Sequence, residues 1–299
     1  MTHLSTDQLL KIQWLLHDCG NQVHQMTNEQ LQVFEKGRDD YVTNVDRALD
    51  RRLTSTFSTL FPQDGVITEE NVQSRQEFFS NYQRLWLIDP LDGTDAFIQG
   101  GSHYAIMVGL LEANQPVAGW IYAPALSQGY YGSAERGLFQ SVEPPFGSVN
   151  PPRSSQPLAV KEPEPPSLQF CPILIGYKDR QRYGELIADL IPGVQFSNIG
   201  SFGLKVMQVV TGRAGLYVYL NRRVKLWDTV GPVALAKAAG LVCCDLDGEP
   251  LRFTLDVLNP ETLAHSQPIV IGWPRYVELL RSRLQWAVAL KDGMRSQLK

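Results

Sequence analysis

A short apolar run that ends directly at two acids is the feature that most constrains the fold of this chain. Residues 85–88 read LWLI, and the segment that follows, residues 89–94, reads DPLDGT. A short apolar run between charged residues is typical of a buried strand. The sequence therefore predicts two carboxylates, those of Asp89 and Asp92, at the end of a strand.

Apolar periodicity predicts helices and strands along most of the chain. A helix is expected over residues 5–26, where Ser5 and Gln8 fit a capping box, and a second helix is expected to start near Thr43. Further helices are predicted over residues 180–190, 201–211, 228–239 and 274–290. Strands are predicted over residues 65–68, 104–112, 117–124, 129–133, 138–139, 171–176, 215–220 and 268–273. This mixture indicates layered α and β elements in two halves.

Composition argues against several classes of protein. The apolar fraction of 43% favours a globular chain with a sizeable core, and the net charge of −4 argues against a general nucleic-acid binder. No uncharged apolar run is long enough to predict a transmembrane helix, and residues 1–7 do not resemble a secretory signal. The four cysteines are too few for a disulfide scaffold, which favours a cytoplasmic location.

The segment DPLDGT carries groups that suit a metal and an anion. Two carboxylates three residues apart at a strand end can converge on one hard cation, and carboxylates with a backbone carbonyl are ligands that Mg²⁺ prefers. Gly93 lets the backbone approach a ligand closely. If a short helix begins at Thr94, the amides of Gly93 and Thr94 form an anion site. An ordinary Asp-rich turn is the alternative, and spacing alone leaves it open.

Three further acids lie at the ends of predicted elements. Glu69 and Glu70 follow the strand at 65–68, Asp46 lies at a helix start, and Asp228 opens another helix after Trp227. Each has a simpler explanation, since paired glutamates are often solvated and aspartates often cap helices. Their shared position at element ends is nevertheless where carboxylates from distant segments can meet.

Taken together, these segments resemble the inositol monophosphatase family, which includes 3′(2′),5′-bisphosphate nucleotidases and some fructose-1,6-bisphosphatases. The matching segments, in the family's order, are DYVTNVD at 40–46, TEEN at 68–71, DPLDGT at 89–94 and WD at 227–228, with a looser match at GSFGL (200–204) and VVTG (209–212). The resemblance covers nearly the whole chain. It implies an α+β or α/β fold, the layered αβαβα sandwich of this family.

The resemblance also implies a Mg²⁺-dependent phosphomonoesterase with two or three metal ions. The first ion would be bound by Glu69, Asp89 and the carbonyl of Leu91. The second would be bound by Asp89, Asp92 and Asp228, and a third, weaker site would involve Asp46 and Glu69. We expect residues 1–155 to form an α+β half with most metal ligands, and residues 156–299 an α/β half that carries Asp228 and the substrate-specificity residues.

The implied chemistry is attack by a metal-activated water, for which Asp46, Glu69 and Thr94 are the catalytic candidates. Thr94 with Asp46 would orient or deprotonate the water, while the amides of Gly93 and Thr94 would hold the phosphate. Paired metals stabilise the attacking and leaving oxygens of an in-line displacement. The resemblance further implies inhibition by lithium.

The substrate is less constrained. Inositol-specific relatives have a glutamate seven residues before the last aspartate, where this chain has Asn221, which argues against strict inositol specificity. The basic side chains of Arg222, Arg223 and Lys225 could bind a second phosphate of the substrate, or they could simply belong to a solvated loop. The expected substrate-binding residues are Gly200, Ser201, Asn221, Arg222, Arg223 and Lys225.

Three functions follow as hypotheses. The first is hydrolysis of an inositol monophosphate or a sugar phosphate, and the second is 3′(2′),5′-bisphosphate nucleotidase activity on adenosine 3′,5′-bisphosphate. The third, a protein-binding regulator without catalysis, is disfavoured by the complete set of acids and Thr94. The expected partner is a small phosphate ester, with no nucleic acid and no membrane. A homodimer is compatible with the resemblance, although no feature of the sequence marks a dimer face.

Overall fold

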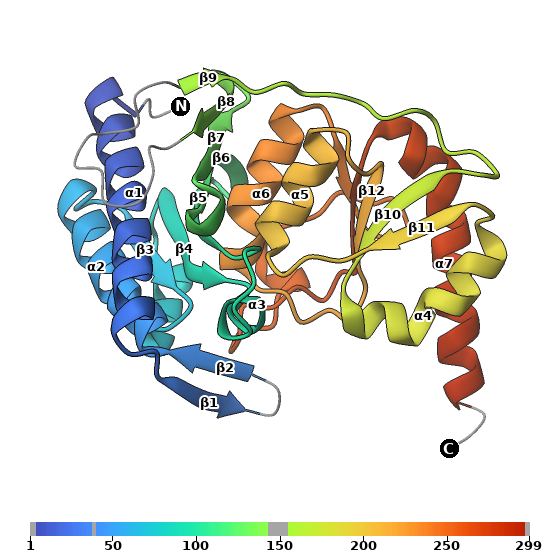
Figure 1. Cartoon of the computed structure of the whole chain (residues 1–299), viewed down its shortest axis with the longest axis horizontal. Helices are drawn as coiled ribbons and strands as arrows, with labels where there is room; N and C mark the ends of the chain where they lie inside the picture. Colours follow the sequence, from blue (N-terminus) through green and yellow to red (C-terminus); the bar gives the residue numbers. More distant parts are fainter. Residues whose placement is uncertain (1–3, 38–39, 143–154, 297–299) are drawn as a thin grey trace. The chain divides into compact units, whose positions relative to one another are not determined.

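The computed structural model describes residues 4–37, 40–142 and 155–296 and divides into two compact units (Figure 1). Unit 1 comprises Met1–Leu158, Gly200–Leu204 and Leu226–Leu235. Unit 2 comprises Ala159–Ile199, Lys205–Lys225 and Ala236–Lys299. The segment with Asp228, expected in the C-terminal half, groups with unit 1. The division into halves at residue 155 stays a prediction.

Unit 1 is built on a seven-stranded sheet with the order β3-β4-β5-β6-β7-β8-β9. The first pair is parallel and every following pair is antiparallel. A separate hairpin pairs β1 with β2. The strands are β1 Val33–Gly37, β2 Asp40–Thr43, β3 Gly65–Thr68, β4 Arg84–Asp92, β5 Ala105–Glu112, β6 Gln115–Ala123, β7 Gln128–Ser133, β8 Gly137–Val142 and β9 Ser155–Pro157.

Two helices, α1 (Thr6–Glu29) and α2 (Asn44–Leu60), cover one face of this sheet (Figure 1). Each begins with a capping box, formed by Ser5 with Gln8 and by Thr43 with Asp46. The reciprocal hydrogen bonds satisfy amides that the first helical turn leaves without partners. Both helices, and the capping box at Ser5, were expected from the sequence and are confirmed.

The opposite face of the sheet carries a contact between three glycines. A Cβ atom on Gly119 of β6 would lie 2.2 Å from the carbonyl oxygen of Gly231, and one on Gly109 of β5 would lie 2.3 Å from the Gly231 nitrogen. Gly231 belongs to α6 (Leu226–Ala238), so its backbone lies directly against the two strands. This close approach fixes the first turns of α6, and with them Asp228, against the sheet of unit 1.

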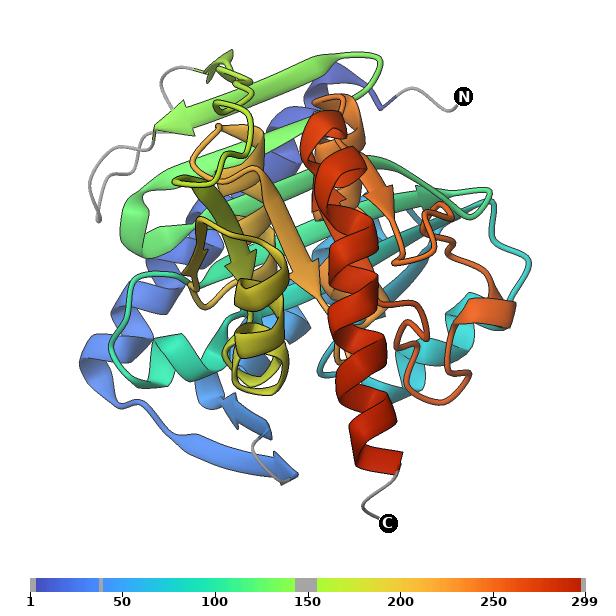
Figure 2. The ribbon, with the colours of Figure 1, turned by 90° about the vertical axis from the view of Figure 1, so that its right-hand side faces the viewer.

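Unit 2 holds a mixed five-stranded sheet with the order β11-β10-β12-β14-β13. Strand β10 is parallel to β11 and β12, and β14 is antiparallel to β12 and β13. Helices α4 and α7 pack against each other (Figure 2). The bounds are β10 Cys171–Ile175, α4 Tyr177–Leu190, β11 Val194–Ser197, α5 Phe202–Val210, β12 Leu216–Tyr219, β13 Val242–Cys244, β14 Ile269–Gly272 and α7 Pro274–Ser296.

The elements that sequence patterns missed are short. The hairpin β1–β2, with strands of five and four residues, and strands β9, β11 and β13 were not predicted, because such segments show too few alternations to be recognised. Of the proline-rich stretch 141–168, which the sequence leaves open as a linker or a surface loop, residues 143–154 lie outside the described residues. Among the described residues, no helix is both long and apolar enough to span a bilayer.

The glycine contact gives a stability prediction. We expect Gly119→Ala to lower the free energy of unfolding by about 1–3 kcal/mol, since the new methyl group would overlap the backbone of α6. Urea unfolding followed by circular dichroism measures this change. Gly293→Ala, where a Cβ atom would meet nothing within 4 Å, is the matched control and should not be destabilised. An unchanged unfolding midpoint for Gly119→Ala would contradict the packing described above.

Candidate active site

Carboxylates from three elements of unit 1 meet at one end of its sheet. Glu69 directly follows β3, Asp89 lies near the end of β4, and Asp228 lies in the first turn of α6. One carboxylate oxygen from each residue lies within 4.8 Å of the others. The sequence expectation that these acids converge is therefore met for these three, and the group they form can hold a metal ion.

The pairing of β3 with β4 places two of these acids side by side. The strands are parallel with Thr68 opposite Ile88, and the Glu69 amide donates to the Ile88 carbonyl at 3.1 Å. The next residue on each strand is an acid, Glu69 on one and Asp89 on the other. Because the strands run in the same direction, both side chains emerge at the same edge of the sheet.

An irregularity in β4 changes the direction in which the side chain of Asp92 points. Asp89 pairs with Met107 of β5, and Asp92 pairs with Ala105. Residues 89–92 of β4 therefore lie opposite residues 105–107 of β5, so β4 has one extra residue in this stretch. Residues three apart in a regular strand point to opposite faces, and the extra residue of a bulge removes this alternation. Pro90, which has no amide hydrogen, suits such a position. The Leu91 amide then donates to Asp89 Oδ1 at 2.8 Å.

Asp92 is held by the segment before and at the start of α5. The Ser201 hydroxyl donates to Asp92 Oδ2 at 2.5 Å, and the Gly203 amide donates to the same oxygen at 3.0 Å. Asp92 lies outside the group of three acids, yet its charge raises the pKa of Asp89. Ser201 and Gly200 were expected to contact substrate, which stays a prediction. The structure shows the fully buried Ser201 hydroxyl bonded to Asp92.

Thr94 and Asp46 also meet, as the sequence analysis expected. Helix α3 (Thr94–Ile98) begins after Gly93, whose φ of +92° favours glycine. The Thr94 hydroxyl lies 3.0 Å from the Leu91 carbonyl oxygen and 3.3 Å from Asp46 Oδ1. The other oxygen of Asp46 accepts from the Thr43 amide at 2.9 Å and from the Thr43 hydroxyl. One carboxylate oxygen of Asp46 therefore caps α2, while the other contacts Thr94.

The electrostatics of the cluster favour a bound cation. Asp89 is 1% exposed, and burial first, then the charges of Glu69, Asp92 and Asp228, raise its pKa well above the usual range of an aspartate. Burial likewise raises the pKa of Asp46. A divalent cation among these oxygens would relieve both the desolvation and the repulsion, because it supplies opposite charge at short range. The residues present therefore fit a metal ion.

Sequence reasoning missed how closely Lys36 of β1 approaches the site. Its Nζ lies 3.2 Å from Glu69 Oε1 and 2.6 Å from Glu70 Oε1. Burial acts to lower the pKa of Lys36, but the charges of Glu69, Glu70 and Asp40 and the hydrogen bond to Glu70 raise it above its ordinary value. Only the fold of the hairpin brings Lys36 to Glu69, which lies 33 positions away in the sequence.

Arg75 was also missed. Its guanidinium carbon lies 5.3 Å from the centre of the Trp227 ring, over the residue that precedes Asp228. Trp227 is fully buried, so Arg75 packs against a rigid neighbour of the acidic cluster. No motif in the sequence points to this contact, because the two residues lie about 150 positions apart.

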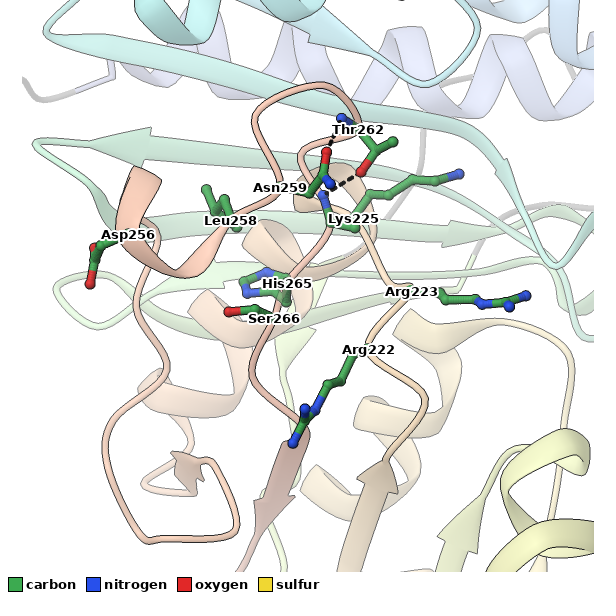
Figure 3. A pocket seen from close by; sticks show the side chains of 10 residues that line it. Arg222, Arg223, Lys225, Asp256, Leu258, Asn259, Thr262, His265 and Ser266 are labelled. Atoms are coloured by element: carbon green, nitrogen blue, oxygen red, sulfur yellow. Dashed lines mark hydrogen bonds between the residues drawn. The ribbon is translucent and has the colours of Figure 1, made fainter. Parts of the chain in front are cut away.

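The other expected substrate residues belong to unit 2. Arg222, Arg223 and Lys225 line a pocket of about 550 Å³ together with a second segment, residues 256–266 (Figure 3). In Figure 3 the side chains of Arg223 and Lys225 extend to the same side, and that of Arg222 points away from them. The side-chain oxygen of Asn221 accepts from the Arg223 amide at 3.1 Å, so this residue forms a turn. A role of these residues in substrate binding stays a prediction.

Comparison with known sequences identifies the relatives of this fold. A family model described as the inositol monophosphatase family matches residues 6–285. The 3′(2′),5′-bisphosphate nucleotidase CysQ of Haemophilus influenzae is 28% identical over 277 residues, which cover 91% of this chain and 95% of that protein.

Solved structures of the same kind match over almost the whole chain. An IMPase from Thermotoga maritima has a TM-score of 0.74 and 22% identity, covering 96% of this chain and 100% of the other. An IMPase/NADP phosphatase complexed with Mg²⁺ and phosphate has a TM-score of 0.69 and 21% identity, covering 93% and 94%. These matches confirm the expected fold class, the layered αβαβα sandwich.

The raised carboxyl pKa values give a pH-dependent prediction. Burial and the charge of Glu69 raise the pKa of Glu70 from 4.5 to about 7. Between these values the folded protein binds more protons than the unfolded chain, so the free energy of unfolding falls as pH rises through this window. We expect the metal-free protein to have a lower Tm at pH 8 than at pH 6, and Mg²⁺ to raise the Tm more at pH 8.

Thermal unfolding in EDTA and in Mg²⁺ at both pH values measures this effect. Glu70→Gln should weaken the pH dependence of the metal-free protein, whereas Glu185→Gln, an exposed glutamate of α4, should leave it unchanged. A Tm that rises with pH in EDTA, or that is insensitive to Mg²⁺, would contradict the electrostatic description.

Proposed function

Because the chain belongs to the inositol monophosphatase family and is a phosphatase, we propose that it hydrolyses an inositol monophosphate or a sugar phosphate with Mg²⁺ as its metal. The observation that carries this proposal is the convergence of carboxylate oxygens from Glu69, Asp89 and Asp228 within 4.8 Å. Phosphate monoesters hydrolyse extremely slowly without a catalyst, so strong electrostatic stabilisation of the transition state is required. A cluster of acids that holds a divalent cation, with Asp89 buried at its centre, would meet that requirement.

The proposed metal ligands are those that the family resemblance implies, and the meeting of Glu69, Asp89 and Asp228 supports them. We assign Glu69, Asp89 and the Leu91 carbonyl to one ion, and Asp89, Asp92 and Asp228 to a second. A third site would use Asp46 and Glu69. When bound, the ions lower the pKa of a coordinated water and neutralise charge on the reacting phosphate. The number of ions is part of the proposal.

The protein's own groups would prepare the water and hold the ester. Asp46 Oδ1 lies 3.3 Å from the Thr94 hydroxyl, so the carboxylate can accept the threonine proton while the threonine oxygen accepts one from water. The raised pKa of Asp46 brings this carboxyl nearer to the range useful for a general base. Gly93 has a left-handed backbone and directly precedes α3, and we assign the amides of Gly93 and Thr94 at this helix start to the phosphate oxygens.

A 3′(2′),5′-bisphosphate nucleotidase activity is the second candidate. Arg222, Arg223 and Lys225 border one pocket of unit 2, and cations on an exposed loop suit a second phosphate. The segment is continuous in sequence with α6, which carries Asp228. The similarity to the CysQ protein adds support for this branch. Adenosine 3′,5′-bisphosphate is the corresponding substrate.

Three further properties belong to the proposal. We expect inhibition by lithium and a homodimer, which rest on the family resemblance, and a cytoplasmic location, which rests on the small number of cysteines. The regulator without catalysis remains the least favoured hypothesis, because a protein that only binds a partner has no chemical need for this set of buried acids. Size-exclusion chromatography with light scattering tests the dimer directly.

Phosphate release with Mg²⁺ tests the proposed function. The panel consists of inositol 1-phosphate, fructose 1,6-bisphosphate and adenosine 3′,5′-bisphosphate, each with and without lithium. We expect Asp89→Asn to lower kcat/KM about a thousandfold, which corresponds to about 4 kcal/mol of transition-state stabilisation. Asp95→Asn, an exposed aspartate of α3, is the matched control and should retain wild-type activity.

Two outcomes would overturn the proposal. The first is the absence of turnover by the wild-type protein on every ester of the panel. The second is full activity of Asp89→Asn, which would show that the acidic cluster does not take part in catalysis. A hundredfold preference for one ester would decide between the two candidate substrates, since it corresponds to about 2.7 kcal/mol of discrimination.

A further inference from the structure

The segment that follows Glu69 folds back onto the strand that precedes it. A 3₁₀ helix, η1 (Val72–Phe79), packs against β3. The Thr68 amide donates to the Ser74 hydroxyl at 3.0 Å, and this hydroxyl donates, at 2.6 Å, to the carbonyl of the residue that caps η1. These bonds tie η1 to the strand residue just before Glu69. The residue after Ser74, Arg75, therefore has a fixed place relative to Glu69.

The side chain of Arg75 reaches the start of α6. Its guanidinium carbon lies 5.3 Å from the centre of the Trp227 ring, within the distance of about 6 Å at which a cation is attracted to an aromatic face. Among aromatic side chains, tryptophan attracts a cation most strongly. Trp227 is 0% exposed and directly precedes Asp228, and both η1 and the start of α6 belong to unit 1. The contact therefore links the segment of Glu69 to the helix turn that carries Asp228.

The three acids of the cluster are not all held by the same kind of contact. The parallel register of β3 and β4 fixes Glu69 beside Asp89. Asp228 comes from a helix, so its distance from this pair depends on how α6 packs against the rest of unit 1. The backbone contact at Gly231 sets how closely α6 approaches the sheet, and the contact of Arg75 connects the first turn of α6 to η1. Arg75 thus acts on Asp228, whose place the strand register does not determine.

We propose that Arg75 is a positioning residue of the metal site. Its contact with Trp227 holds the first turn of α6 to η1, and it thereby maintains the separation of the Glu69 and Asp228 carboxylates at which a divalent cation binds. Mg²⁺ is sensitive to such a separation, because it demands near-octahedral oxygen ligands at about 2.0–2.1 Å. This inference rests on the proposed function for the identity of the metal, and it concerns the affinity of the site rather than the choice of ester.

The sign of the effect separates this role from that of a nearby positive charge. A guanidinium close to the acids repels a divalent cation, so removing a group that acted through its charge alone would strengthen Mg²⁺ binding. Removing a group that holds two ligands in place weakens Mg²⁺ binding instead. A lysine at this position keeps the charge and can still lie over the indole ring, which makes Arg75→Lys the conservative variant.

Calorimetric titration of the metal-free protein with Mg²⁺ tests the proposal. We expect Arg75→Met, which keeps an extended apolar side chain without the charge, to raise the Kd for Mg²⁺ at least about fivefold. Arg75→Lys should raise this Kd by less than about twofold. Arg180→Met is the matched control, because it removes a guanidinium carbon that lies 5.6 Å from the centre of the Phe196 ring in unit 2. This control should leave the Kd unchanged.

Thermal unfolding gives a second readout, which a merely structural role would not change. A ligand that binds the native state raises the Tm less when its affinity is lower. We therefore expect Mg²⁺ to raise the Tm of Arg75→Met less than that of the wild-type protein or of Arg180→Met. A contact that only stabilised the fold would lower the Tm equally in EDTA and in Mg²⁺. If Arg75→Met does not fold, Arg75→Gln replaces it, with the same expected loss of affinity.

The outcomes separate this inference from the proposed function. A Kd of Arg75→Met or Arg75→Gln at or below the wild-type value would refute the positioning role, and so would an equal loss of affinity in Arg75→Lys. The phosphatase would then stand, because phosphate release by the wild-type protein is measured separately. Failure of the wild-type protein to bind Mg²⁺ would overturn the metal site and this inference with it. Mg²⁺ binding without turnover of any ester would overturn the proposed function, and the measured affinities would still decide the role of Arg75.

Discussion

Repulsion between clustered carboxylates is the constraint on which the rest of the structure depends. Glu69, Asp89 and Asp228 bring their oxygens within 4.8 Å of one another, and burial penalises the negative charge of Asp89. Without a cation, the fold must hold these groups together against their mutual repulsion. With a divalent cation, the same arrangement becomes favourable. The metal is therefore an expected part of the native state as well as of the chemistry.

Several elements of unit 1 hold these carboxylates in place. The parallel register of β3 and β4 fixes Glu69 beside Asp89, and the bulge in β4 changes the direction of the Asp92 side chain. The contact of Gly231 with the sheet holds α6, and hence Asp228, in place. Backbone packing without side chains leaves little freedom to move, which suits a site where small displacements weaken metal coordination.

Local patterns in the sequence were sufficient for part of this description. The capping box of the first helix and the carboxylates of DPLDGT at a strand end were predictable, because each depends on neighbouring residues. The convergence of Glu69, Asp89 and Asp228 was expected from their positions at element ends and from the family resemblance. The approach of Lys36 to Glu69 and the hydrogen bond from Leu220 to Asp179 were not. These contacts join residues 33 and 41 positions apart, and only the folded chain brings them together.

Calorimetric titration of the metal-free protein with Mg²⁺ near pH 7 tests the central claim most directly. In buffers of different ionisation enthalpy, it measures both the affinity and the number of protons released. The account predicts saturable binding with release of protons, since the carboxyls of Asp89 and Asp46, whose pKa values are raised, must ionise to bind the metal. Absence of binding at millimolar Mg²⁺, or equal binding by Asp89→Asn, would contradict it.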